Sequence, residues 1–210
     1  MTEKILIATH NSAKFERYKA LLEPLKNLEI VSLSDVGITE KINEPFINTK
    51  DNAIHKAKFY SKLSNLITIA IDEAVQTNFL PNNEQPGVYV RRLKKGKTEA
   101  TDKEVLDFWE ELFKHYPQTD KKFIWDYGIA YYNNKTNQLG YSQIEIESTI
   151  KQPFSKKLTP GYPMSSFLIL PGTDKCHGDL TEQEKTANDI IYFENFIKNF
   201  SSWIKESSVT

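Results

Sequence analysis

The 210-residue sequence contains a single cysteine, Cys176, and only four histidines. One thiol cannot form an internal disulfide, so a small fold held together by disulfides is excluded. Four scattered histidines with one cysteine do not provide the ligand spacing of a zinc site. The glycine-rich patterns of Rossmann and Walker nucleotide-binding loops are absent as well.

Long apolar segments are also missing. The longest apolar run, Leu66 to Ile71, has six residues and includes Thr68. A membrane helix needs about 20 apolar residues, so we expect no membrane association. The N-terminal residues lack the profile of a signal peptide, and we therefore expect a cytoplasmic protein.

Charge of one sign is not in excess. The 27 lysines and arginines nearly balance 28 aspartates and glutamates, which leaves a formal net charge of -1. This balance argues against broad electrostatic binding to nucleic acid, so we expect no nucleic-acid partner. Aromatic residues, in contrast, are plentiful, with 12 Phe, 10 Tyr and 3 Trp. These side chains suffice for a hydrophobic core, and the length allows one large or two small domains.

The N-terminal third alternates between strand and helix patterns. Short apolar strands are expected at residues 4–8, 28–33 and 66–71. Helical periods follow Ser12 and Asp51, and the third strand is expected to end at Asp72-Glu73. This alternation predicts an α/β protein.

The remaining sequence has clear boundary signals. Two capping-box patterns, Thr101 with Glu104 and Thr181 with Glu184, each predict the start of a helix. The elements expected here are a loop at 76–97, hairpin strands at 123–132 and 139–150, and one long terminal helix with Ile190, Phe193, Ile197, Phe200 and Ile204 on its buried face.

Polar residues follow two of the expected strands, where ligands bind in open α/β sheets. The segment from Thr9 to Lys14 lies at a helix N-terminus, where free backbone N–H groups, the helix dipole and a lysine favour an anion. Asp72 and Glu73 are oxygen ligands of the kind that Mg²⁺ prefers. Taken alone, the first segment is better interpreted as an ordinary helix cap and the second as a solvated turn.

The order of these segments resembles that of the inosine triphosphate pyrophosphatase family. The family's Thr-x-Asn-x-x-Lys pattern is matched by Thr9, Asn11 and Lys14, and its Asn-Ala-x-x-Lys-Ala pattern by residues 52–57. Its Pro-Gly-Val-Tyr segment is present without change at residues 86–89. Later stretches of the family are matched by Gly172, Asp174, Lys175, Glu184 and Lys185.

The resemblance implies an elongated α/β fold with a long twisted mixed sheet, in which residues 1–210 form a single domain with a cleft between two lobes. It implies a hydrolase that converts non-standard purine nucleoside triphosphates such as ITP and XTP to the monophosphate and pyrophosphate. It further implies Mg²⁺ as the cofactor, a small-molecule nucleotide as the substrate, and a homodimer.

The resemblance also assigns roles to individual residues. Asp72 is expected to be the catalytic base, Lys56 a catalytic residue, and Asp72 with Glu44 the metal ligands. His10 replaces a residue that is usually glycine, and it either touches phosphate or fills the turn. The substrate-binding residues implied are Thr9, His10, Asn11, Ser12, Ala13, Lys14, Glu73, Tyr162, Ser165 and Lys185.

Departures from the family pattern are concentrated in the part that reads the base. The family's Asp-Asp-Ser-Gly is Ile71-Asp72-Glu73-Ala74 here, and the glutamate expected three residues after Lys14 is Arg17. The aspartate of a late aromatic-Asp-Pro segment is Ser165, and Asp189-Ile190-Ile191 replaces a base-reading Ser-His-Arg. Two alternatives stay open beside the family's reaction: hydrolysis with altered base specificity, and a catalytically impaired nucleotide-binding protein.

Overall fold

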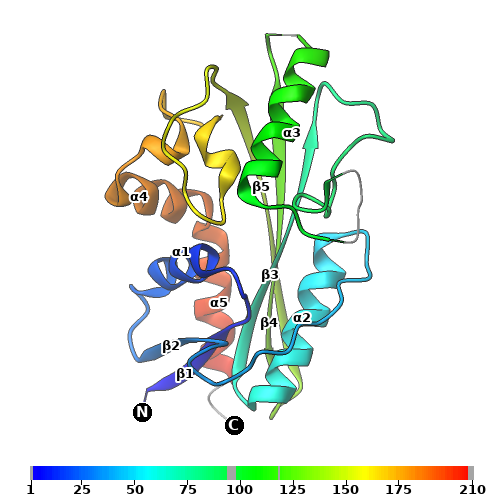
Figure 1. Cartoon of the computed structure of the whole chain (residues 1–210). Helices are drawn as coiled ribbons and strands as arrows, with labels where there is room; N and C mark the ends of the chain where they lie inside the picture. The colour runs from blue at the N-terminus through cyan, green and yellow to red at the C-terminus, as the bar shows by residue number, and fades with distance from the viewer. Residues whose placement is uncertain (1, 94–97, 118, 208–210) are drawn as a thin grey trace. The chain divides into compact units, whose positions relative to one another are not determined.

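The computed structural model describes residues 2–93, 98–117 and 119–207 (Figure 1). Its strands are β1 (Glu3–Ile7), β2 (Leu28–Ser32), β3 (Ile67–Thr77), β4 (Lys122–Asn133), β5 (Gln138–Ile150) and β6 (Leu168–Ile169). Its α-helices are α1 (Ser12–Leu22), α2 (Thr49–Ser64), α3 (Asp102–His115), α4 (Glu182–Tyr192) and α5 (Glu194–Ser207). Two short 3₁₀ turns, η2 (Pro163–Ser166) and η3 (His177–Asp179), follow β5.

The strands form a mixed sheet in the order β2-β1-β3-β4-β5-β6. β1 is parallel to both β2 and β3, with Ile5 opposite Ile30 on one side and Ile67 on the other. Each of these parallel connections contains a helix, α1 or α2, as a crossover requires. β4 and β5 are neighbours joined by a turn at 134–137, and β5 is antiparallel to β6. The expected α/β class and the expected hairpin are confirmed.

The chain divides into two compact units. The first consists of residues 1–72, 127–144 and 186–210, and the second of residues 73–126 and 145–185. Of the loop expected at 76–97, which falls in the second unit, residues 94–97 lie outside the described ranges.

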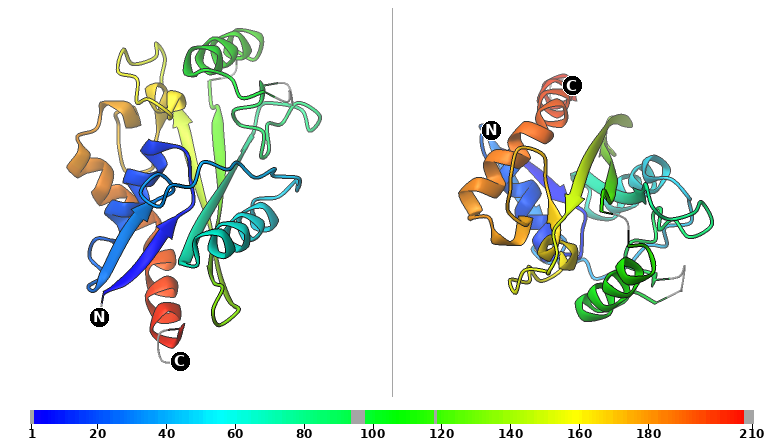
Figure 2. Two further views of the ribbon diagram at one scale, coloured as in Figure 1. Left: turned by 60° about the horizontal axis from the view of Figure 1, so that its bottom comes forward. Right: turned by 90° about the horizontal axis from the view of Figure 1, so that it is seen from above.

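In the first unit, helices cover both faces of the strands. Tyr132 of β4 belongs to the same buried cluster as Ala53, Ala57 and Tyr60 of α2. The preceding residue, Tyr131, packs instead on α5, with its ring centroid 5.4 Å from that of Phe200. Because successive residues of a strand point to opposite faces, α2 and α5 lie on opposite sides of β4. The views in Figure 2 show the same arrangement.

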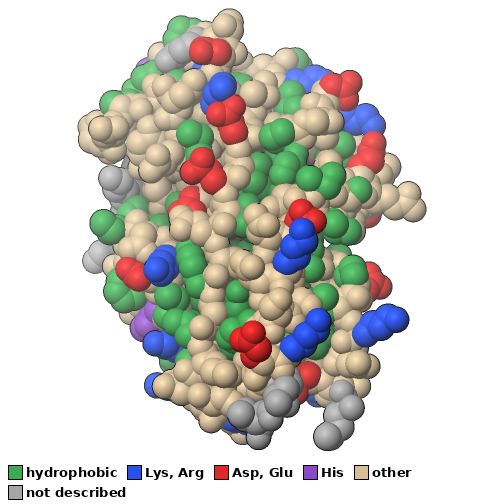
Figure 3. Space-filling view, turned by 180° about the vertical axis from the view of Figure 1, so that it is seen from behind, with side chains coloured by type: hydrophobic (Ala, Val, Ile, Leu, Met, Phe, Trp, Pro, Cys, Tyr) green, Lys and Arg blue, Asp and Glu red, His purple; other side chains and the backbone are tan. Residues whose placement is uncertain are grey.

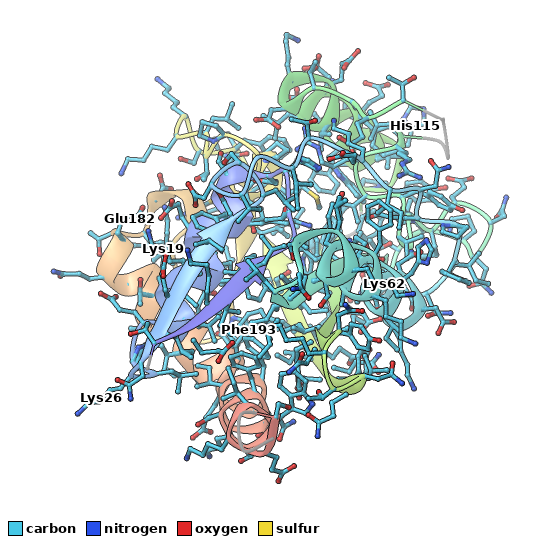
Figure 4. The ribbon with its side chains drawn as sticks, turned by 90° about the horizontal axis from the view of Figure 1, so that it is seen from below. Lys19, Lys26, Lys62, His115, Glu182 and Phe193 are labelled. Carbon is cyan, nitrogen blue, oxygen red and sulfur yellow. The ribbon has the colours of Figure 1, made fainter. Side chains whose placement is uncertain are left out.

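The α5 side of this unit is built from aromatic rings. Tyr18 of α1 meets Phe193 and Phe196 edge to face, with centroids 5.6 and 6.2 Å apart. Figure 4 shows Phe193 among the packed elements, whereas Lys26 reaches outward. This packing attaches α1, and therefore the polar turn in front of it, to the C-terminal part of the chain.

The single terminal helix expected from the sequence is wrong, because the chain forms α4 and α5 with an interruption at Phe193. Ile190, expected on the buried face, is exposed, and its neighbour Asp189 is buried instead. The reason is a tertiary contact: the guanidinium of Arg17 neutralises the Asp189 carboxylate, so this carboxylate rather than the isoleucine faces inward.

The second unit has an aromatic core around α3. Trp109 and Phe113 of this helix pack against Phe123 and Phe167, with centroid distances between 4.8 and 6.4 Å. The predicted capping box is present, since Thr101 and Glu104 bond each other's backbone N–H groups. The second predicted box, Thr181 with Glu184, is present in the same form.

The third strand does not end at Asp72 and Glu73, as expected, but continues as β3 to Thr77. Backbone pairing explains the extension. β3 has β4 as a hydrogen-bonded neighbour, and Val75 exchanges two backbone hydrogen bonds with Gly87, at 3.0 Å each. Two acidic side chains do not interrupt a strand whose backbone groups are satisfied.

The surface shown in Figure 3 carries lysine and arginine side chains interspersed with aspartate and glutamate, in keeping with the small net charge. Across the ranges that the structure describes, no helix has both the length and the apolar character needed to cross a membrane.

Candidate active site

Helix α2 is seated tightly on the strands of the first unit. Ala53 and Ala57 are fully buried, and their small side chains allow the helix to approach the sheet closely. At the N-terminal end of α2, a Cβ atom added to Gly128 of β4 would lie 2.7 Å from the backbone carbon and oxygen of Thr49. The lack of a side chain at Gly128 therefore lets the first turn of α2, which contains Asn52, lie against β4, and Lys56 follows one turn later.

The Lys56 ammonium group is the centre of the candidate site. Its Nζ atom donates to Glu44 Oε1 at 2.7 Å, to the carbonyl oxygen of Ile71 at 2.6 Å and to Asp72 Oδ1 at 3.1 Å. An ammonium group has three N–H bonds, so this buried cation has a full set of acceptors. The predicted catalytic pair, Lys56 and Asp72, and the predicted metal ligand Glu44 are thus brought together.

The charges in this cluster alter one another's proton affinity. Burial is the strongest influence on Asp72 and raises its pKa above the ordinary value, while the charges of Lys56 and Lys14 act in the opposite direction. Burial disfavours the charged form of Lys56, but Asp72 and Glu44 outweigh it and raise the pKa of the ammonium group. The site therefore combines a persistent cation with a carboxylate of increased basicity.

Asn52 is a site residue that had no role assigned from the sequence. Its Oδ1 atom accepts from the Phe46 backbone N–H at 3.0 Å, and its Nδ2 atom donates to the Phe46 carbonyl oxygen at 2.9 Å. The same Nδ2 atom donates to Asp72 Oδ2 at 3.1 Å. The available signal was the four-residue spacing from Lys56, which places both side chains on one face of a helix.

The turn before α1 is held by its own side chains. Thr9 Oγ1 accepts from the Asn11 N–H at 3.1 Å, and Asn11 Oδ1 accepts from the N–H groups of Ala13 at 2.9 Å and Lys14 at 3.2 Å. The expectation that these backbone N–H groups are free is therefore wrong, because Asn11 is the N-cap of the helix. Ser12, the first residue of α1, is exposed. The first turn of α1 contains no acidic residue that would compensate the positive end of the helix dipole.

His10 contacts the loop that carries Glu44. Its Nε2 atom lies 3.0 Å from the Glu40 carbonyl oxygen, which also accepts from the Tyr60 hydroxyl at 2.8 Å. This arrangement agrees with the interpretation in which His10 fills the turn. Its contact with phosphate stays a prediction.

Four predicted substrate-binding residues lie in the second unit. Glu73 follows Asp72 in β3 and is half-buried. Ser165 is buried, and its backbone N–H donates to the Tyr162 carbonyl oxygen at 3.0 Å. Lys185 donates to Glu182 Oε1 at 2.7 Å. All of these contacts lie within the second unit. They do not test binding of a substrate, so the substrate-binding roles of these residues stay predictions.

Two positions that depart from the family pattern contact each other. Arg17 Nε and Nη2 donate to the two carboxylate oxygens of Asp189 at 2.9 and 2.5 Å. The guanidinium group also lies over the rings of Phe193 and Tyr127, at 4.8 and 5.5 Å from their centroids. The bidentate pair occupies both oxygens of Asp189, so the carboxylate serves to attach α1 to α4.

The cluster fits a divalent cation only in part. Within the described ranges, no group of three or more His, Cys, Asp and Glu residues is placed to hold a metal ion. Glu44 and Asp72 nevertheless converge on one point, the Lys56 ammonium group. Mg²⁺ is commonly held by one or two carboxylates together with substrate phosphates and water, so these residues fit an ion that arrives with a nucleotide.

Fold and site together define an α/β protein with a buried lysine–carboxylate cluster at the sheet. The model of the Ham1 family matches residues 5–190, and the chain belongs to the Ham1 family. A dITP/XTP pyrophosphatase of Bacillus subtilis (strain 168) is 27% identical over 205 residues, which cover 97% of this chain and 98% of that relative. A dITP/XTP pyrophosphatase of Thermoanaerobacter pseudethanolicus is 28% identical over 201 residues, covering 92% and 96%.

Solved structures agree with this assignment at the level of the fold. A HAM1 protein from Coxiella burnetii has a TM-score of 0.74 at 24% identity, covering 98% of this chain and 100% of that chain. The Staphylococcus aureus Ham1 protein has a TM-score of 0.69 at 18% identity, with the same coverage. The family resemblance and the fold class expected from the sequence are confirmed.

Proposed function

We propose that this chain is a nucleoside triphosphate pyrophosphohydrolase that acts on non-standard purine nucleotides such as ITP, dITP and XTP. The observation that carries the proposal is the convergence of Glu44 and Asp72 on the Lys56 ammonium group, at 2.7 and 3.1 Å. Relatives that cover nearly the whole chain carry the name dITP/XTP pyrophosphatase, which supports the same reaction.

In the proposed reaction, Asp72 accepts a proton from the water molecule that attacks the α-phosphorus. The bond from the α-phosphorus to the bridging oxygen breaks, and pyrophosphate leaves with that oxygen. Burial suits Asp72 to this role, since it raises the pKa of the carboxylate. Lys56 and Lys14 stabilise the negative charge that develops on the phosphate oxygens.

Asp72 and Glu44 would hold Mg²⁺ jointly with the phosphate oxygens, and the bound ion would neutralise charge on the triphosphate. Thr9 and Asn11 position the triphosphate at the positive end of α1. The cytoplasmic location, the homodimer and the lack of a nucleic-acid partner stay predictions.

The proposal includes altered base selection, because the residue at one base-reading position has another partner. Asp189 stands where the family has a base-reading segment, and it is buried against Arg17. Hydrogen bonds to a base discriminate between substrates, whereas phosphate contacts and a metal ion supply rate. We therefore expect a broader substrate range rather than loss of hydrolysis.

The test is pyrophosphate release with Mg²⁺ from ITP, dITP, XTP and the four common ribonucleotides. It compares the wild type with Asp72→Asn and with Asp107→Asn, an exposed aspartate of α3. Turnover by the wild type and Asp107→Asn, but not by Asp72→Asn, is the expected result. Full activity of Asp72→Asn would overturn the mechanism. No turnover by the wild type, together with thermal stabilisation by nucleotide, would instead indicate a binding protein that does not catalyse.

A further inference from the structure

Asn52 connects two parts of the site that lie far apart in the sequence. Its side-chain amide makes three hydrogen bonds, two to the backbone of Phe46 and one to Asp72, at 2.9 to 3.1 Å. The residue is only 1% exposed. A side chain so enclosed acts through the groups that it holds rather than by touching a substrate.

The first of these groups is the segment that carries Glu44. Residues 39–46 form neither helix nor strand, so no regular backbone pairing sets their path. The segment is held on one side of Glu44 by the Glu40 carbonyl oxygen, which accepts from Tyr60 and contacts His10. On the other side, the Asn52 amide bonds both the N–H and the carbonyl of Phe46, as a neighbouring strand would.

The second group is the Asp72 carboxylate. Its Oδ2 atom accepts from Asn52 at 3.1 Å, and its Oδ1 atom accepts from Lys56 at the same distance. Two donors on two different oxygens restrict rotation of the carboxylate plane. Both donors come from α2, one helical turn apart.

We propose that Asn52 is a positioning residue that aligns Glu44 and Asp72 for hydrolysis by bonding the Glu44 segment and the Asp72 carboxylate at once. The role requires a donor and an acceptor on one short side chain, which asparagine has and aspartate lacks at neutral pH. This inference rests on the proposed function, because it concerns the efficiency of the same site.

The test compares Asn52→Ala and Asn52→Asp with Asn48→Ala. Asn48 is a matched control, since it is another asparagine of the same helix start, and its side chain caps α2 through Asp51 without bonding Phe46 or Asp72. Steady-state kinetics with ITP and Mg²⁺ give kcat and KM, and amide hydrogen exchange by NMR follows the Phe46 N–H.

We expect kcat to fall roughly 10- to 100-fold in both Asn52 variants, with KM changed by less than about threefold. Asn48→Ala should keep the wild-type kcat even if its melting temperature falls as far as that of the Asn52 variants. Exchange of the Phe46 N–H accelerates in Asn52→Ala but not in Asn48→Ala. The carboxylate in Asn52→Asp can still accept from the Phe46 N–H, but it cannot donate to Asp72. This variant therefore tests the hydrogen bond to Asp72 separately from the hydrogen bond that holds the Glu44 segment.

Wild-type kcat in either folded Asn52 variant, or unchanged exchange of the Phe46 N–H in Asn52→Ala, would overturn the inference. If Asn52→Ala does not fold, the kinetics of Asn52→Asp decide. An inactive wild type would refute the proposed function and, with it, the catalytic part of the inference. The exchange comparison would then still report whether Asn52 holds the Glu44 segment.

Discussion

Replacement of Lys56 by methionine removes the positive charge that Glu44 and Asp72 share and keeps a side chain of similar length. The change leaves the Ile71 carbonyl and both carboxylates without the donor that lies 2.6 to 3.1 Å away in the native protein. Breaking a buried ion pair on one side typically costs about 3–5 kcal/mol. Glu44 is partly solvated, with 28% of its side chain exposed, so we expect the lower end, about 3 kcal/mol.

For a protein of 210 residues, a loss of about 3 kcal/mol lowers the melting temperature by roughly 6–12 °C. The effect depends on pH with a defined sign. Without Lys56, the pKa of Asp72 rises further above its unfolded value, so the folded state takes up protons before the unfolded state does as the pH falls. The deficit is therefore full well above the pKa of Asp72 and shrinks as the pH falls towards it.

The assay is thermal unfolding followed by circular dichroism between pH 5 and pH 8. Lys62→Met is the matched control, because Lys62 is an exposed lysine near the end of the same helix. It should change the stability by no more than about 0.5 kcal/mol. A deficit for Lys56→Met that equals that of the control at pH 8, or that grows as the pH falls, would refute the reasoning.

Three further outcomes follow from the geometry. Gly128→Ala should cost about 1–3 kcal/mol in urea denaturation and reduce turnover, since its Cβ would lie 2.7 Å from the Thr49 backbone; an unchanged midpoint would contradict this. Arg17→Ala should cost about 3–5 kcal/mol by leaving Asp189 buried and unpaired, and the exchanged pair Arg17→Asp with Asp189→Arg should recover part of the loss. In a pH profile of kcat/KM, activity should fall on the acid side at a pH above the ordinary aspartate value of about 3.9, because burial raises the pKa of Asp72; an acid limb at or below that value would argue against Asp72 as the base.

Several elements were predictable because their signals are local. The apolar strand at residues 4–8 and the polar turn at Thr9 to Ser12 correspond to β1 and the start of α1 within a residue or two. Capping boxes depend on side chains three residues apart, and both were found where the pattern placed them. The four-residue spacing of Asn52 and Lys56 likewise placed both on one face of α2.

Elements whose limits depend on distant partners were not predictable. The third strand was expected to end at Asp72 and Glu73, because adjacent charged residues usually mark a turn. In the structure β3 continues to Thr77, since Val75 is paired through its backbone with Gly87. The terminal helix was expected to bury Ile190, whereas the ion pair of Asp189 with Arg17, 172 positions away, turns a different face inward.

The amino-acid order alone shows which residues are available for chemistry and, through helical spacing, that Asn52 and Lys56 lie on one face of a helix. Tertiary packing brings Glu44, on a segment without helix or strand, to the same ammonium group as Asp72. The two kinds of information differ because the interactions act over different ranges of sequence. Helix caps and side-chain spacing are satisfied within one turn of chain, whereas a buried ammonium group takes its acceptors from whichever segments the packed fold brings within about 3 Å.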